Sequence, residues 1–259
     1  MTEIWLTHLN VAQGLKPPTL DAPHVGLVLI PAYNEARALG PVLQALRTHL
    51  SEWTLLVIDD GSTDATAEVA RAAGADVVLR LPCNLGIGGA VQTGFQYAAR
   101  HGFRRVVRLD ADGQHAASAI AAMIAAQEAE QADVVVGSRF VGERSFQSTL
   151  SRRLGIWVLS TLTRVLTGAI VKDVTSGFRI YGERALPLLA YDYPINYPEP
   201  DENVFLLRRG LKLIEVSAQM HERTAGTSSI RGLGSLLYMV EVSLSMIMTA
   251  VRPAHKGER

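Results

Sequence analysis

Residues 25–50 read VGLVLIPAYNEARALGPVLQALRTHL, and this stretch decides the fold class. It opens with a short run of Val, Leu and Ile, which is typical of a strand buried on both faces of a sheet. A polar turn follows at 31–35. Apolar residues then recur at helical spacing, as Leu39, Val42, Leu43, Leu46 and Leu50. The stretch therefore predicts one strand, a turn and one helix.

The same strand–turn–helix pattern recurs along the chain. Further strand-like runs lie at 54–58, 76–81, 105–109 and 133–136, with helical patterns near 62–74, 89–101 and 116–131. This alternation predicts an α/β fold, a Rossmann-like and mostly parallel sheet flanked by helices. Beyond 140 we predict a helix at 150–167, a loop entering a strand at 173–181, a helix at 201–209 and a strand at 211–218.

Composition indicates one folded domain. The chain has 259 residues, 48% of them hydrophobic and 19% charged, which supports a sizeable core. We divide it into an N-terminal arm at 1–24, the domain at 25–232, and an apolar helix with a basic tail at 233–259. A formal net charge of zero and the lack of a basic stripe argue against nucleic-acid binding. The single Cys83 excludes an intrachain disulfide, and no signal-peptide pattern opens the chain, so we expect a cytoplasmic protein.

Polar clusters follow nearly every predicted strand, where ligands bind in such sheets. Asp110 and Asp112 form a D-x-D turn, and closely spaced carboxylates suit Mg²⁺ or Mn²⁺ bound to a diphosphate. The alternative for this motif is a solvated turn. Asp60 is placed to accept hydrogen bonds from a base or ribose, whereas Ser62, Thr63 or Asp64 is expected to cap the next helix.

Two further clusters are candidates for contacts to a nucleotide. In the turn at 31–35, Tyr33 could stack on a base and Glu35 could bind ribose, although a plain turn is the alternative. At 84–90 the Gly-rich sequence NLGIGGA lets backbone N–H groups approach a ligand, and Gly89 is our candidate there. This loop matches neither G-x-G-x-x-G nor the P-loop.

Taken together, these stretches resemble family 2 of the glycosyltransferases, which have the GT-A fold. The resemblance is carried in order by VLIPAYNEARAL (28–39), VIDDGSTDAT (57–66), NLGIGGAVQTGF (84–95), RLDADGQH (108–115), GSRF (137–140), DVTSGFRIY (173–181) and RTAGTSSI (223–230). It is strongest to the polyprenyl-phosphate branch, similar to dolichol-phosphate mannosyltransferases. The resemblance implies an inverting transfer from a nucleotide-sugar to a polyprenyl phosphate or glycan, in cell-envelope polysaccharide biosynthesis.

The resemblance also implies roles for individual residues. The metal ligands would be Asp110, Asp112 and Gln114. Arg223, with the loop 223–230, would bind the diphosphate. With our added candidates, the expected nucleotide contacts are Pro31, Ala32, Tyr33, Glu35, Asp60, Gly89, Asp110 and Ala111. We favour UDP as the nucleotide on family frequency alone.

The acceptor stays open at this point. An acidic stretch, YPEPDE at 197–202, offers Glu199, Asp201 or Glu202 as a general base for a hydroxyl acceptor, and a solvated loop is the alternative. A phosphate acceptor needs no base, because it is already an anion. Two other functions compete: an inactive family member that acts as an assembly partner, and a sugar-1-phosphate nucleotidyltransferase. The second lacks the Gly-rich basic loop that it would need after the first strand.

The stretch 235–251 is apolar but is interrupted by Glu241 and is too short to span a bilayer. One interpretation is an interfacial helix that holds the protein peripherally at the inner face of a membrane. The other is a core helix or a homodimer helix.

Overall fold

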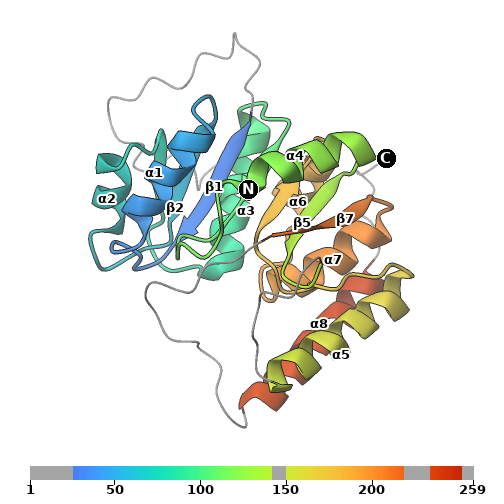
Figure 1. Ribbon diagram of the computed structural model, residues 1–259. Coiled ribbons are helices and arrows are strands. Elements are labelled where there is room, and N and C mark those ends of the chain that lie inside the picture. Colours follow the sequence, from blue (N-terminus) through green and yellow to red (C-terminus); the bar gives the residue numbers. More distant parts are fainter. Residues whose placement is uncertain (1–25, 142–149, 219–233, 253–259) are drawn as a thin grey trace.

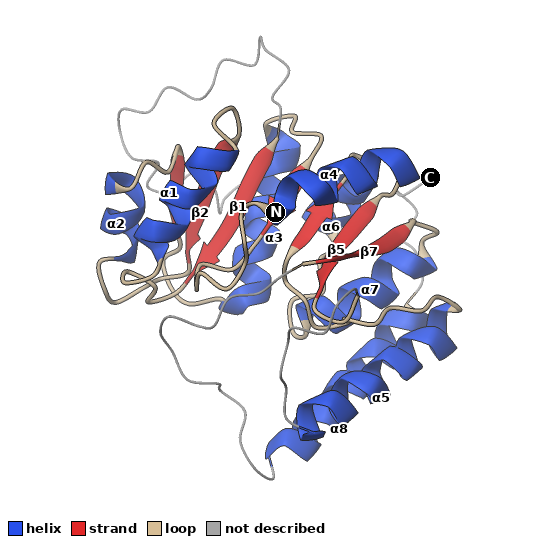
Figure 2. Ribbon diagram, viewed as in Figure 1, coloured by secondary structure: helices blue, strands red, loops and turns tan. Residues whose placement is uncertain are grey.

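The structure, a computed structural model, describes residues 26–141, 150–218 and 234–252 (Figure 1). A twisted central sheet is covered by helices on both faces, as Figure 2 shows. Its strands are β1 (Leu27–Ala32), β2 (Thr54–Asp59), β3 (Val77–Arg80), β4 (Val106–Arg108), β5 (Val134–Ser138), β6 (Arg179–Tyr181) and β7 (Leu213–Ser217). The helices are α1 (Leu39–His49), α2 (Thr66–Ala72), α3 (Gly86–Arg100), α4 (Ala119–Glu130), α5 (Leu150–Thr167), α6 (Ala185–Tyr191), α7 (Pro198–Arg208) and α8 (Gly234–Val251).

The strands form one sheet in the order β3-β2-β1-β4-β6-β5-β7. Every pairing is parallel except those of β6, which runs antiparallel to both β4 and β5. The predicted α/β, mostly parallel architecture is therefore confirmed. The antiparallel β6 follows a long excursion through α5 and enters the sheet at the carboxyl edge that β5 leaves, since its first residue, Arg179, pairs with Val136 near the end of β5.

Alternation along the strands builds two cores, one on each face of the sheet. Val28 and Ile30 of β1 pack under α1, α2 and α4. Leu27 and Leu29 point the other way and pack under α3, α6 and α7. Both faces are buried, which explains why the strands are continuous apolar runs rather than alternating ones.

A third, smaller cluster lies away from the sheet. It joins α5, α7 and α8, which cross near one another at the lower right of Figure 1, through residues such as Leu159, Val204 and Met246. The apolar stretch at 235–251 forms the helix α8. Within the described ranges, no helix is long and apolar enough to cross a membrane.

Several local predictions need correction. α2 begins at Thr66, after Ala65, and of the three cap candidates only Asp64 bonds it, through Oδ1, which accepts a hydrogen bond from the Thr66 N–H at 3.0 Å. Ser62 and Thr63 bond Asn34 in the turn after β1 instead. α7 begins at Pro198 rather than near 201, since Pro fits the first turn of a helix. α6 was not predicted at all; it has only seven residues, which is too short for a clear periodic pattern.

Candidate active site

Strand register brings three of the predicted clusters to one edge of the sheet. Leu29 of β1 pairs with Arg108 of β4, so the two strands end side by side and Asp110 follows within two residues. On the other side of β1, Ala32 pairs with Asp59 of β2, one residue before Asp60. The D-x-D turn and the ends of the first two strands therefore share the carboxyl edge of the sheet.

The turns after β1 and β2 are bonded to each other. Ser62 Oγ accepts a hydrogen bond from the Asn34 N–H at 2.9 Å, and Asn34 Oδ1 accepts one from the Thr63 N–H at 2.9 Å. Asn34 adopts a left-handed conformation, φ 56°, which tightens the turn. Glu35 is held through its N–H by Thr66 Oγ1 at 2.9 Å. This fixed double turn leaves Tyr33 at the surface, 46% exposed, as a base-stacking ring would need to be.

Asp60 is buried beneath the Gly-rich loop. Its Oδ1 accepts a hydrogen bond from the Leu85 N–H at 2.7 Å, and the residue is only 3% exposed. Burial raises the pKa of Asp60, although hydrogen bonds from the backbone of Leu85 and Gly86 act in the opposite direction. Asp60 thus orients the loop that opens α3, a role that the sequence did not indicate.

The D-x-D turn holds its two carboxylates differently. Asp110 is 39% exposed at its side chain, and its Oδ2 lies 3.3 Å from Nε2 of the buried His115. Asp112 is 6% exposed, with Oδ1 accepting a hydrogen bond from the Gln114 N–H at 3.0 Å. Ala111 between them is buried. Asp110 is therefore the open carboxylate, and Asp112 is fixed by the turn.

Gly177 leaves room for the Asp110 carboxylate. A Cβ at position 177 would lie 3.1 Å from Asp110 Oδ2 and 3.2 Å from Oδ1, closer than ordinary van der Waals contact. The oxygen atoms of Asp110 and Asp112 are the donors that Mg²⁺ and Mn²⁺ prefer, so these residues fit a divalent cation. In the described part of the chain, no three His, Cys, Asp or Glu side chains could hold a metal by themselves. The other ligands would come from a diphosphate and water.

The three acidic candidates of the 197–202 stretch have different environments. Glu202 is fully buried, and its carboxylate binds Arg179 at 2.8 Å and Tyr193 at 3.0 Å. Asp201 is 2% exposed and accepts a hydrogen bond from Ser245 of α8. Neither carboxylate has a surface from which to contact an acceptor. Glu199 keeps 21% of its side chain exposed and binds Arg108 at 2.5 Å.

A family model for glycosyl transferase family 2 matches residues 27–187, which includes the D-x-D turn and the turns after β1 and β2. The chain belongs to glycosyltransferase family 2. It is 32% identical to the undecaprenyl-phosphate mannosyltransferase of Micrococcus luteus, over 80% of this chain and 87% of that protein. It is 31% identical to the UDP-N-acetylglucosamine–dolichyl-phosphate N-acetylglucosaminyltransferase of Methanococcus voltae, over 63% and 71% of the two chains.

Solved structures show the fold of this family 2 chain. Glucosyl-3-phosphoglycerate synthase from Mycobacterium tuberculosis, solved with Mn²⁺, UDP and glucosyl-3-phosphoglycerate, superposes with a TM-score of 0.65. The alignment covers 92% of this chain and 84% of that one, at 19% identity. The expected GT-A architecture is therefore shown, and the chain is a glycosyltransferase by family.

Sequence reasoning missed the polar layer beneath the site of this glycosyltransferase. Arg108 and Arg179 pair in register on β4 and β6, and both are fully buried. Although burial alone lowers the pKa of Arg108, the nearby Tyr193 and Glu199 raise it well above its ordinary value. The only available sign was an Arg inside each of two apolar strands, which by itself does not identify its partners.

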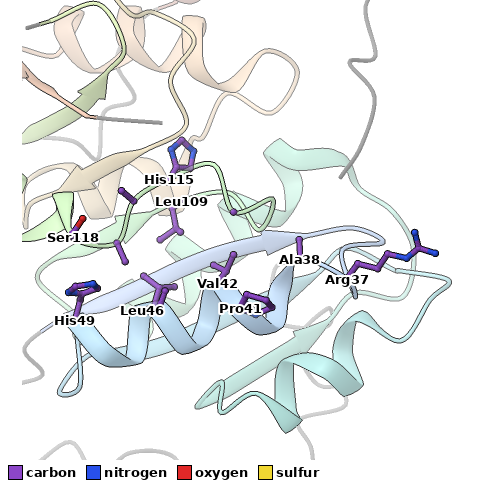
Figure 3. Close-up of a pocket in the computed structure, with 13 residues that line it drawn as sticks. Arg37, Ala38, Pro41, Val42, Leu46, His49, Leu109, His115 and Ser118 are labelled. Atoms are coloured by element: carbon purple, nitrogen blue, oxygen red, sulfur yellow. The ribbon is translucent and has the colours of Figure 1, made fainter. Parts of the chain in front are cut away.

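A groove of about 380 Å³ lies between α1 and the 109–118 loop. It is lined by none of the predicted site residues, and Figure 3 shows the His115 ring turned away from α1.

Two predicted site residues remain to be placed. The predicted diphosphate ligand Arg223 and its loop 223–230 lie outside the described residues. Gly89 sits in the first turn of α3, where a Cβ would meet Leu85 at 2.6 Å.

Proposed function

We propose that this chain is an inverting, metal-dependent glycosyltransferase that moves a sugar from a nucleotide-sugar, with UDP favoured, to a polyprenyl phosphate. The observation that carries the proposal is the edge of the sheet that these turns share. The Asp110–Asp112 turn follows β4 on one side of β1, and the turn with Asp60 follows β2 on the other side. Family membership supports transfer from an activated sugar. Two of its relatives are named for transfer to undecaprenyl phosphate and to dolichyl phosphate, which supports a lipid-linked phosphate acceptor.

Asp110, Asp112 and Gln114 would hold a divalent cation, which would supply positive charge to offset the charge on the departing diphosphate. Mn²⁺ in the Mycobacterium tuberculosis protein of the same fold supports this choice of cofactor, with Mg²⁺ as the other candidate. The protein contributes a fixed turn, so little reorganisation is needed when charge develops. Arg223 is proposed to add a second positive charge on the diphosphate.

The nucleotide is proposed to lie across the ends of β1 and β2. Tyr33 would stack on the base, with Glu35 and Asp60 on the ribose and base edge. Backbone atoms at 31, 32, 89 and 111 would complete the contacts. The bonds between the two turns support this assignment, because a rigid double turn fixes the backbone that carries Tyr33.

The transfer forms one bond and breaks one. An oxygen of the acceptor phosphate attacks the anomeric carbon from the side opposite the leaving group, and the bond from that carbon to the diphosphate oxygen breaks. The nucleoside diphosphate leaves with the electron pair. No proton has to be removed, because the acceptor is an anion at neutral pH. For a hydroxyl acceptor, the second candidate, Glu199 is the one acidic residue of the three with an exposed side chain near Asp110.

The proposal is tested with purified protein, Mn²⁺, radiolabelled UDP-sugars and undecaprenyl phosphate in mixed micelles. We expect a labelled lipid product, and an Asp112→Asn variant should form it at least about 100-fold more slowly while keeping its fold. Glu183→Gln, which changes an exposed carboxylate on the far side, is the matched control. A chain that neither hydrolyses nor transfers any activated sugar would instead be the inactive assembly partner, and Asp112→Asn at wild-type rates would exclude the metal site.

A further inference from the structure

The outward sides of α5 and α8 carry large apolar residues that no other described element covers. On α5, Leu154, Trp157 and Val165 are 62%, 64% and 75% exposed. On α8, Leu237, Leu244 and Met248 are 67%, 57% and 68% exposed. We call these six residues the apolar face. They recur at helical spacing on each helix, so each set lies on one side of its helix.

The two helices are packed together with fixed orientations. Their inward residues, among them Leu159 and Met246, belong to the third core cluster. Two hydrogen bonds to the 197–202 stretch fix the rotation of α8, from Tyr197 Oη to Glu241 at 2.8 Å and from Ser245 Oγ to Asp201 at 2.5 Å. Figure 1 shows α5 and α8 side by side at one end of the molecule, away from the sheet. The two halves of the apolar face therefore lie on neighbouring helices whose orientations are fixed.

One hydroxyl on this surface is satisfied within its own helix. Thr161 lies between Trp157 and Val165 on the exposed side, and its hydroxyl donates a hydrogen bond to the Trp157 carbonyl at 2.8 Å. Such a bond satisfies a hydroxyl within its own helix, as a nonpolar surrounding requires.

The charges beside the apolar face indicate which kind of partner it binds. Exposed Arg153 and Arg164 fall on the same side of α5 as Trp157, at helical spacing. Within the described residues of α5 and α8, Glu241 is the one carboxylate, and it is bonded to Tyr197. A second copy of this chain would bring like charges together, whereas anionic headgroups complement arginines beside an apolar strip.

We propose that the apolar face of α5 and α8 docks flat on an anionic lipid bilayer. The helices would lie in the interface, with Trp157 at headgroup level and the apolar side chains among the upper acyl chains. The inference names the surface of contact and does not depend on the sugar-transfer reaction, since binding is measured without a donor.

The test is cosedimentation of the full chain with vesicles of phosphatidylcholine, with and without phosphatidylglycerol. We expect binding that increases with phosphatidylglycerol and falls with salt. The double variant Trp157→Glu with Leu244→Glu should lower the partition coefficient at least about tenfold. The matched control, Ala122→Glu with Ala125→Glu, adds the same charge to exposed positions on α4 and should bind as the wild type does.

Two results would overturn the proposal. One is equal vesicle binding by the double variant and the wild type. The other is a wild-type dimer, seen by sedimentation velocity, that ignores vesicles and becomes monomeric in the double variant; the face would then bind a second copy. Donor hydrolysis with Mn²⁺, measured on the same samples, separates this outcome from a failure of the proposed function, because the double variant should hydrolyse donor as the wild type does.

Discussion

Arg108 and Glu199 form an ion pair at 2.5 Å although 91 positions separate them in the chain. Arg108 lies fully buried on β4, two residues before Asp110, and Glu199 lies in the first turn of α7. A Cβ at Gly177 would approach both Asp110 and Arg108 Nη2, the latter at 3.5 Å. The pair therefore links the acidic stretch to the D-x-D turn and sets Glu199 near the proposed site.

Glu199→Gln distinguishes the two acceptor classes. If the acceptor is a phosphate, as we propose, the variant should transfer sugar within a few-fold of the wild-type rate, since no proton is removed. Loss of about 100-fold or more, in a folded variant, would instead assign Glu199 as the base for a hydroxyl acceptor. Transfer to undecaprenyl phosphate is the measurement, and circular dichroism checks the fold.

Glu202→Gln should destabilise the protein by about 3–5 kcal/mol, because it removes a charge that compensates buried Arg179. Urea unfolding measures this loss. Glu183→Gln is the comparison, since the Arg104–Glu183 pair is exposed and its loss should cost less than about 1 kcal/mol. Equal stabilities of the two variants would mean that the buried pair contributes no more than a surface one.

Gly177→Ala should weaken Mn²⁺ binding roughly tenfold, because the added methyl group displaces the Asp110 carboxylate that lies against it. Calorimetric titration with Mn²⁺ and UDP measures the affinity. Gly40→Ala is the matched control, since its Cβ would meet Val69 at an ordinary 3.8 Å and should leave Mn²⁺ binding unchanged. Unaltered affinity in the first variant would argue against Asp110 as a ligand.

Asp201 should make stability depend on pH. Burial raises its pKa from 3.8 to about 6, while the hydrogen bond from Ser245 lowers it. The folded state therefore keeps a proton that the unfolded state releases, so stability is greatest below the unfolded value and falls as the pH rises from about 4 to about 6. Asp201→Asn, which keeps its neutral form throughout, should abolish this part of the decline in thermal denaturation. An identical pH profile for the two proteins would contradict the assignment.

Much of the proposed site could be predicted because its motifs follow strands. Polar residues after strands meet at one edge in any parallel sheet, so Asp60 and Asp110 could be placed together before any register was known. The structural role of Asp60 under the Gly-rich loop could not be predicted, because its hydrogen bond to Leu85 spans 25 positions. It also could not be predicted which of Glu199, Asp201 and Glu202 stays exposed, since spacing along 197–202 does not say which side chain is buried.

The sequence by itself determined the alternation of strands and helices, the edge where ligands would bind, and the family. These features follow from local periodicity and from residues within one turn of each other. Only the tertiary structure decided that β6 runs antiparallel and that α5 and α8 carry an exposed apolar face. It also decided that Glu202 binds Arg179 and that Asp201 accepts a hydrogen bond from Ser245. Such outcomes depend on contacts between distant segments, and burial is fixed only when those segments pack.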